Sequence, residues 1–373
     1  MVGPVVRACA LLLLALLPVA TACAAPAEQA YRPPAGRVLF SQAGTDLWQS
    51  APDGSGARQL TFDGAPTGNG YTGGGWSPDG TLIAAERNLA AESGTGLYLV
   101  DPVARTSARL TRPNTFLDGY AWSPDGRYVT YGELTSGGTP GPGGGILGAV
   151  GEVFLYDVQA RAGRALGPGT HPSFSADGRY VGFAHASGAI ATADVATGAL
   201  TNLATLADLT RYSATLAPRG MGLVGGPVWS SDGKLIAYAA IENGPILEAL
   251  QIVYVQEPKP GAVPKQWVIG KTGAVHHVAE LRWSPTQPLL GYSIINAQPH
   301  HHWFGVIDPA GTKLRELHNS VQHFIDFTWS PTGDAVLIQL DDEDAWAIFR
   351  TDRNGAAFRK TPGGWRPDWC RCE

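Results

Sequence analysis

The pentapeptide Trp76-Ser77-Pro78-Asp79-Gly80 decides how this chain folds, because copies of it return along the sequence. The second copy is identical and occupies residues 122–126. Looser copies begin at Phe174, Trp229, Trp283 and Trp329, so the motif aromatic residues stand 46 to 55 residues apart. A recurrence of that length indicates a fold built by repeating one small unit.

The pentapeptide itself predicts a tight turn between two strands. Proline presets φ for the second position of the turn, aspartate accepts nearby backbone N–H groups, and glycine adopts positive φ at no steric cost. Each copy is followed by an apolar run and then by a second run that often ends in aspartate, as in Gly96–Asp101. Together with the strand before the turn and a last short strand, each repeat supplies four strands. Four short strands make one blade of a β-propeller, and the motif aromatic residue is expected to pack between neighbouring blades.

The two chain ends complete the repeat pattern. Residues 37–61 supply three outer strands without a motif before them, whereas Arg366-Pro367-Asp368-Trp369 resembles the lead-in Gly226-Pro227-Val228-Trp229. The C-terminal strand is therefore expected to pair with the N-terminal strand, which removes open sheet edges. The prediction is an all-β, seven-bladed β-propeller over residues 37–373, with six blades as the alternative. The blades are placed at 37–61 plus 366–370, 73–112, 119–167, 171–204, 226–271, 280–318 and 326–361, with long loops at 135–151 and 207–225.

Residues 1–22 predict an export signal that is not part of the fold. Arg7 precedes an apolar run over residues 8–19, which is too short to span a bilayer, and Ala20-Thr21-Ala22 suits signal cleavage. Because Cys23 follows directly, the stretch resembles a bacterial lipoprotein signal, which implies a lipid on Cys23; ordinary cleavage is the alternative. Residues 23–36 are interpreted as an extended linker. The expected location is therefore the periplasm or the cell surface.

Composition narrows the classes of partner. The chain has 373 residues and a formal net charge of −5, with lysine and arginine scattered along it, so nucleic-acid binding is not expected. Membrane contact is expected only through a lipid anchor, and the protein is expected to be a monomer. Cys370 and Cys372 close the chain, and pairing with each other or with Cys23 stays open at this point.

The histidines are predicted to gather on one face. In a propeller the motif turns lie on one face, here called the turn face. Loops that join second to third strands, and one blade to the next, lie on the opposite face, here called the top face. His185 and the run His300-His301-His302 are placed in the first kind of loop. The second kind of loop is predicted to hold His171, His276, His277, His318 and His323, and the run Asp341-Asp342-Glu343-Asp344 is placed in the corresponding top-face loop of blade seven.

A second set of candidate residues stands three positions before each motif aromatic residue, where the innermost strand is expected to begin. From blade two onward this row reads Gly73, Gly119, His171, Gly226, Glu280 and Asp326, followed by Arg366 for blade one. The prediction places Glu280, Asp326 and Arg366 side by side at the channel mouth, near His277 and His323, as a ligand site or an ion-pair network. Imidazoles beside carboxylates also suit a divalent metal, so His300, His301 and His302 are the metal candidates, with solvated loop histidines as the alternative. No other cofactor is expected.

The repeat resembles a known family. Trp-Ser-Pro-Asp-Gly, an apolar strand, Leu-Tyr-x-x-Asp and Leu-Thr resemble the WD-like propeller repeat of the TolB type. The resemblance implies an exported, non-catalytic propeller that binds a protein, peptide or glycan of the cell envelope. Similar repeats occur in prolyl-oligopeptidase-type enzymes, but the Gly-x-Ser-x-Gly elbow of their hydrolase domain does not occur in this sequence. The chain also resembles the oligogalacturonate lyase family in its seven blades and histidine-rich face, which implies the alternative of a metal-dependent polysaccharide lyase or hydrolase.

Overall fold

Antiparallel strands build most of the chain that the structure describes. The computed structural model describes residues 36–42, 45–65, 68–92, 94–135, 139–140, 146–147, 151–211, 220–243, 249–272, 276–296, 302–310, 314–320, 324–342, 345–353, 359–361 and 365–369. Helix α1 (Leu206–Thr210) has five residues, and no helix in these ranges is long and apolar enough to cross a membrane.

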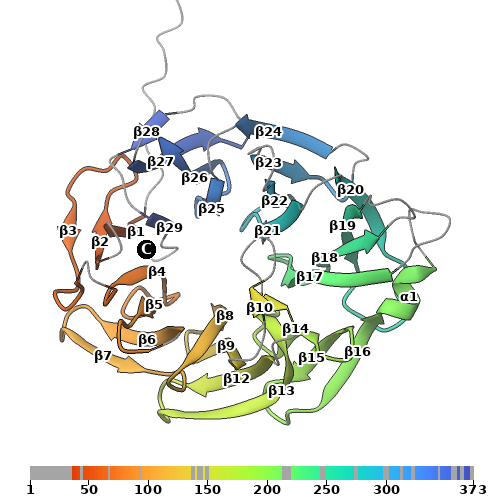
Figure 1. The fold of residues 1–373 in the computed structure, drawn as a ribbon, viewed down its shortest axis with the longest axis horizontal. Helices are drawn as coiled ribbons and strands as arrows, with labels where there is room; N and C mark the ends of the chain where they lie inside the picture. The colour runs from red at the N-terminus through yellow and green to blue at the C-terminus, as the bar shows by residue number, and fades with distance from the viewer. Residues whose placement is uncertain are drawn as a thin grey trace, which may run out of the picture. The chain divides into compact units, whose positions relative to one another are not determined.

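Five of the sheets are separate four-stranded blades, as the sequence predicts (Figure 1). Blade one contains β29 (Trp365–Trp369), β1 (Val38–Gln42), β2 (Asp46–Ser50) and β3 (Arg58–Gln59). Blade two contains β4 (Tyr71–Trp76), β5 (Ile83–Asn88), β6 (Thr95–Asp101) and β7 (Thr106–Arg109). Blade five contains β17 (Gly220–Trp229), β18 (Ile236–Asn243), β19 (Ala249–Gln256) and β20 (Lys265–Thr272). Blade six contains β21 (His276–Trp283), β22 (Leu290–Asn296), β23 (His302–Ile307) and β24 (Leu314–Ser320). Blade seven contains β25 (Phe324–Trp329), β26 (Ala335–Asp342), β27 (Ala345–Asp352) and β28 (Arg359–Thr361).

Blades three and four share one strand, which corrects the loop predicted between them. Blade three contains β8 (Thr115–Trp122), β9 (Tyr128–Thr135), β12 (Gly151–Asp157) and the first half of β13 (Ala162–Phe174). Blade four contains the second half of β13, then β14 (Tyr180–His185), β15 (Ala189–Asp194) and β16 (Leu200–Thr205). The two halves of β13 pair with β12 and with β14, so the chain passes from one blade to the next without a loop. With this junction the blades number seven.

Several residues that the sequence places in loops lie in strands instead. His171 is inside β13, His276 and His277 begin β21, His302 begins β23, His318 lies in β24 and His185 ends β14. The expected loop at 135–151 contains the short hairpin of β10 (Thr139–Pro140) and β11 (Ile146–Leu147), and the one at 207–225 contains α1 and the start of β17. The strands are longer than predicted because ladder pairing continues past the local sequence signal.

Hydrogen bonds inside the motif turn explain why the sequence repeats it. The Ser77 hydroxyl donates to Asp79 Oδ1 (2.6 Å) and accepts from Leu82 N (2.9 Å), while Gly80, at φ +68°, donates its N–H to Ser77 O (2.8 Å). The same serine-to-aspartate bond recurs from Ser123, Ser175 and Ser230. In blade seven, where threonine replaces the aspartate, Ser330 donates to Asp334 instead (2.7 Å). The turn therefore depends on this serine and a nearby carboxylate.

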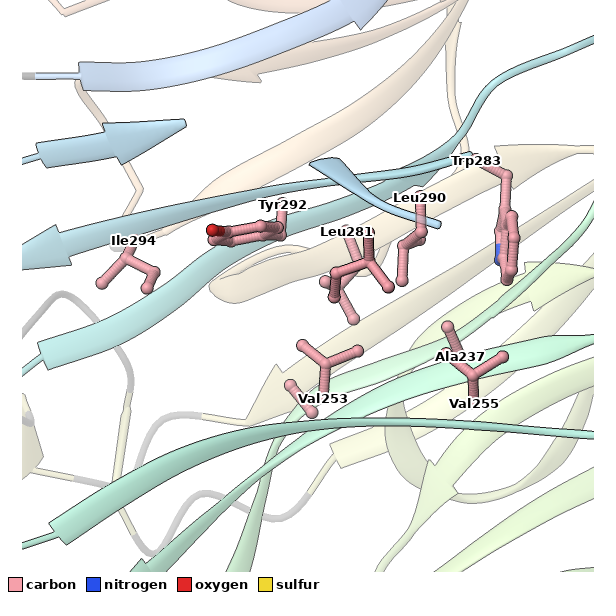
Figure 2. Packing of buried hydrophobic residues seen from close by; sticks show 10 residues of the cluster. Ala237, Val253, Val255, Leu281, Trp283, Leu290, Tyr292 and Ile294 are labelled. Atoms are coloured by element: carbon pink, nitrogen blue, oxygen red, sulfur yellow. The ribbon is translucent and has the colours of Figure 1, made fainter. Parts of the chain in front are cut away.

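The motif tryptophan joins neighbouring blades. The indole N–H of Trp122 donates to Gly75 O, that of Trp283 to Val228 O and that of Trp329 to Arg282 O, each at 3.0 Å. Each acceptor is the residue directly before the motif aromatic residue of the preceding blade. Figure 2 shows the packing between blades five and six, where Trp283, Leu281 and Tyr292 face Ala237 and Val253. The predicted interblade position of the aromatic residue is correct in these blades.

The two ends of the propeller domain lie in one sheet. β29 pairs antiparallel with β1, with Val38 opposite Trp369 and Leu39 opposite Asp368, which is the strand pairing that the sequence predicts. Asp368 also reaches the next blade, because its Oδ2 accepts the backbone N–H of Trp76 (3.1 Å). The C-terminal strand thus supplies the innermost strand of the blade that the N-terminal residues begin.

Candidate functional site

The structure brings together two of the residues predicted at the channel mouth. Glu280 of β21 and Asp326 of β25 lie on either side of Arg282, whose Nε is 3.1 Å from Glu280 Oε1 and whose second guanidinium nitrogen is 3.0 Å from Asp326 Oδ1. Both carboxylates stand in the middle of their strands, since Glu280 is preceded by four residues of β21 and Asp326 by two of β25. The prediction that this row begins the innermost strands is therefore wrong.

Arg282 is the residue at this site that the sequence analysis missed. Its side chain remains 32% exposed, and its guanidinium also donates to Phe327 O of the next blade (2.6 Å). Partial burial disfavours the charged form, but the carboxylates of Asp326, Glu280 and Asp368 outweigh it and hold the pKa of Arg282 above its ordinary value. We call Glu280, Arg282, Asp326 and Asp368 the inner-strand cluster.

Arg282 and Asp368 both stand directly before the motif aromatic residue of their blades. In three blades the polar side chain at this position contacts the innermost strand of the following blade: Ser173 donates to Pro227 O, Arg282 to Phe327 O, and Asp368 accepts from Trp76 N. This position therefore serves as an interblade contact. Measuring one residue back from each motif aromatic residue, in addition to three, would have identified Arg282 and Asp368.

Arg366 and His171 do not join the two carboxylates through any contact that the structure describes. Arg366 lies in β29, and its side chain is outside the described atoms. His171 belongs to blade four, where its N–H donates to Asp118 Oδ2 (2.9 Å) and its Nδ1 lies 3.4 Å from the same oxygen. Its side chain is 48% exposed.

His171 has a strained backbone, and Gly226 accommodates it. The φ of His171 is +54°, which is uncommon for a residue with a side chain. A Cβ atom added at Gly226 would stand 2.2 Å from the Cβ of His171, so no other residue type fits there. The glycine in the predicted row of blade five is thus required by its histidine neighbour. His171 and its partner Asp118 place an imidazole and a carboxylate on the innermost strands of blades four and three, separate from the inner-strand cluster.

Most of the remaining candidates fall outside the described residues. These are His300, His301, His323, Cys23, Cys370, Cys372, Glu343 and Asp344. Only the backbone is described for His277 in β21, for His302 in β23 and for Asp341 and Asp342 at the end of β26. Among the residues with described side chains, no group of three histidines, cysteines or acidic residues is arranged to hold a metal ion.

A cleft on the turn face is a second feature that the sequence analysis missed. It measures about 650 Å³ and lies between blades one and two. Its lining includes Arg37 before β1, Arg58 of β3 and Arg105 in the turn between β6 and β7, and we call it the arginine cleft. The remaining lining residues are Gln59, Leu60, Phe62, Trp76, Gly80, Thr81, Leu82, Asp101, Pro102 and Val103.

Solved structures with propeller regions resemble this chain. It is similar to TolB from Acinetobacter baumannii (TM-score 0.47, 15% identity, 90% of this chain and 66% of that chain). It is similar to the tricorn protease (TM-score 0.53, 11% identity), where the match covers 90% of this chain and 36% of that chain. It is also similar to Porphyromonas gingivalis dipeptidyl peptidase 4 (TM-score 0.50, 12% identity), where the match covers 79% of this chain and 47% of that chain. The chain thus spans about two thirds of that TolB and less than half of either peptidase. At these identities the similarity shows the fold alone, and neither a protein-family model nor a curated protein sequence matches the chain.

Proposed function

We propose that this chain is an exported, non-catalytic propeller that binds a protein, peptide or glycan of the cell envelope through its innermost strands and the top-face loops beside them. The supporting observation is the inner-strand cluster, in which Arg282 contacts the carboxylates of Glu280 and Asp326, and the charge of Asp368 also favours its charged form. The described groups of this cluster carry more negative than positive charge. Such a surface suits a ligand that presents ammonium, guanidinium or hydroxyl donors.

The geometry of the cluster favours binding over catalysis. Arg282 bridges Glu280 and Asp326, so the two carboxylates are held apart by a cation and do not form an open acid–base pair. Charged groups fixed by mutual hydrogen bonds present a rigid pattern to a ligand, and rigidity lowers the entropic cost of binding. A propeller that carries such a pattern on strands of several blades is a scaffold for recognition.

Binding assays with matched variants test this proposal. Chain lacking residues 1–22, with Cys23→Ser, would be titrated against arrays of basic peptides and of envelope oligosaccharides. Glu280→Gln keeps an oxygen that can accept from Arg282 but removes one negative charge, so we expect at least a tenfold loss of affinity for the selected ligand. Glu152→Gln, on blade three at the outer contact with Arg112, is the control and should bind like the parent protein. Equal affinity of both variants would contradict the proposal.

The lipid anchor is part of the proposal and has its own test. The apolar run at 8–19, followed by Ala20-Thr21-Ala22-Cys23, supports export and lipidation of Cys23. Labelled palmitate fed to the producing bacteria is expected to enter the parent protein and not Cys23→Ser. Label in both proteins, or in neither, would contradict anchoring at this residue.

Metal analysis distinguishes the alternative of a metal-dependent lyase or hydrolase. The run His300-His301-His302 supports that alternative by its residue types alone, because His300 and His301 lie outside the described residues and only the backbone of His302 is described. Purified parent protein and the triple alanine variant would be compared for zinc, nickel, copper and manganese. The proposal expects no stoichiometric metal in either. Stoichiometric metal that the triple variant loses, with cleavage of a polysaccharide by the parent, would overturn it.

A further inference from the structure

We infer that the arginine cleft binds an extended peptide segment whose carboxylates flank an aliphatic or aromatic side chain. This site lies on the turn face and uses none of the residues of the inner-strand cluster, although the backbone N–H of its lining residue Trp76 donates to Asp368 of that cluster (3.1 Å). Its volume of about 650 Å³ falls within the range of pockets that enclose a small ligand or a few residues of a peptide. The inference therefore goes beyond the proposed function and can fail or succeed independently of it.

The three arginines of the cleft have no carboxylate partner within salt-bridge distance among the described residues. Arg37 stacks on the Trp76 ring, 4.6 Å from its centroid, and donates a long hydrogen bond to Gly80 O (3.4 Å) and, in one orientation of the Gln49 amide, another to Gln49 Oε1 (3.4 Å). Arg105 stacks on the Phe62 ring at 4.7 Å. When the Gln49 amide is turned so that its oxygen faces Arg58, that oxygen accepts from Nε (2.7 Å) and from a terminal nitrogen (3.1 Å) of the Arg58 guanidinium. Stacked guanidinium groups are oriented by the ring and keep N–H donors in their plane for a ligand.

The cleft is positively charged within an acidic protein. Asp101 is the acidic residue in its lining, and Asp101 Oδ1 already accepts the N–H groups of Val103 (2.9 Å) and Ala104 (2.8 Å). The lining therefore has three cations against one anion, although the whole chain carries a formal charge of −5. Several arginines elsewhere in the described chain pair with carboxylates, as Arg87 with Asp63, Arg109 with Glu92 and Arg127 with Asp157. The guanidinium groups of Arg37, Arg58 and Arg105 are therefore expected to bind carboxylates of a ligand.

Apolar side chains beside the arginines specify the rest of the ligand. Phe62 is 57% exposed and Val103 is 90% exposed. They are two of the five large hydrophobic residues that are exposed in the described chain, and both line this cleft with Leu60 and Leu82. An inorganic anion would use the arginines and leave these side chains in water. A peptide with an apolar residue between acidic ones would cover both kinds of group.

The concave form of the site favours a peptide over a membrane surface. The cleft lies between two blades, and its floor includes the buried Trp76, which a flat bilayer surface would not reach. A segment of a partner protein in extended conformation places alternate side chains on opposite sides, which suits arginines at separated positions. We therefore commit to a peptide, and anionic vesicles serve as the competing outcome in the test.

Fluorescence anisotropy with defined peptides tests the inference. The probe is a fluorescein-labelled peptide of alternating glutamate and phenylalanine, and the comparison peptide has glutamine in place of glutamate. Protein lacking residues 1–22 with Cys23→Ser is expected to bind the acidic probe at least tenfold more tightly than the comparison peptide at low salt, with affinity falling as salt rises. Arg105→Gln should weaken binding about tenfold, and Arg58→Gln together with Arg105→Gln about a hundredfold.

A matched control variant and vesicles complete the design. Arg179 follows the motif turn of blade four and, like Arg37 and Arg105, stacks on an aromatic ring, that of Tyr180 at 5.1 Å. It lies outside the cleft and pairs with Asp194 (3.5 Å). Arg179→Gln is expected to bind the probe like the parent. Phe62→Ser should weaken binding of the acidic probe severalfold. Unchanged binding in the double arginine variant, equal binding of the glutamine peptide, or arginine-dependent binding of anionic vesicles without binding of the probe would each overturn the inference.

Discussion

Arginines occupy two contrasting environments in this propeller. In the inner-strand cluster, Arg282 contacts Glu280 and Asp326 at 3.1 and 3.0 Å and joins blade six to Phe327 of blade seven. In the arginine cleft, Arg37 and Arg105 stack on aromatic rings and have no carboxylate partner in the described structure. Both kinds of arginine contact a neighbouring blade, but the guanidinium of Arg282 is satisfied by carboxylates of the protein, whereas those of Arg37 and Arg105 are held by ring stacking without a carboxylate.

Removing β29 is expected to have the largest effect, because it deletes Asp368 from the inner-strand cluster and the strand partner of β1. A chain that ends after residue 364 also loses Trp369, which is 2% exposed and packs with Val38 and Phe40. We expect loss of the cooperative thermal transition, measured by circular dichroism. A chain that ends after Trp369 is the control and should melt like the full chain. Equal melting of both truncated chains would show that β29 is not needed for stability.

Replacing Arg282 is expected to have the next largest effect. Arg282→Met leaves Glu280 and Asp326 close together without a cation. Because the side chains of Arg282 and Glu280 are 32% and 36% exposed, the cost lies between that of a surface and a buried ion pair, at about 1.5 kcal/mol. Urea denaturation measures the loss of unfolding free energy. Arg282→Lys keeps the charge but not the planar fork, so its loss should be intermediate. A loss below about 0.5 kcal/mol for Arg282→Met, the size expected of an ordinary surface substitution, would contradict a stabilising role.

The carboxylate of the motif turn provides a pH-dependent test of how its hydrogen bonds stabilise the fold. The pKa of the Asp79 carboxyl is lowered by the hydrogen bond from Ser77 and by those from Thr81, although partial burial raises it. A lowered folded-state pKa contributes stability above the ordinary aspartate value near 4, and this is lost as pH falls through the folded pKa. Asp79→Asn should therefore melt at a lower temperature than the parent at pH 7, and the difference should shrink toward pH 2. A difference that stays constant with pH would contradict this explanation.

The sequence predicted the parts of the fold that repeat. The motif turn depends on residues within five positions of one another, such as Ser77 and Leu82, so each copy indicates the same turn. The pairing of β29 with β1 followed from the same repeat, because one blade lacked an innermost strand and the chain end supplied it.

The candidate site was harder to predict because it depends on contacts between distant strands. Glu280 and Asp326 were correctly placed together. Arg282 was missed because only the position three residues before each motif aromatic residue was compared, and Arg282 stands one residue before Trp283. A register shift between Val278 and Glu280 also moves the innermost strand away from a simple alternation of faces. The arginine cleft has no local signal, since Arg37, Arg58 and Arg105 come from three separate segments of two blades.

The unfolding free energy of Arg105→Gln, measured beside that of Arg282→Met, tests the central contrast most directly. Arg105 is exposed and its described interaction is the stacking on Phe62, so its replacement should change stability by no more than about 0.5 kcal/mol. Arg282→Met should lose about 1.5 kcal/mol in the same urea titration. A loss of similar size in the two variants would contradict the distinction between an arginine paired with carboxylates and arginines held by ring stacking alone.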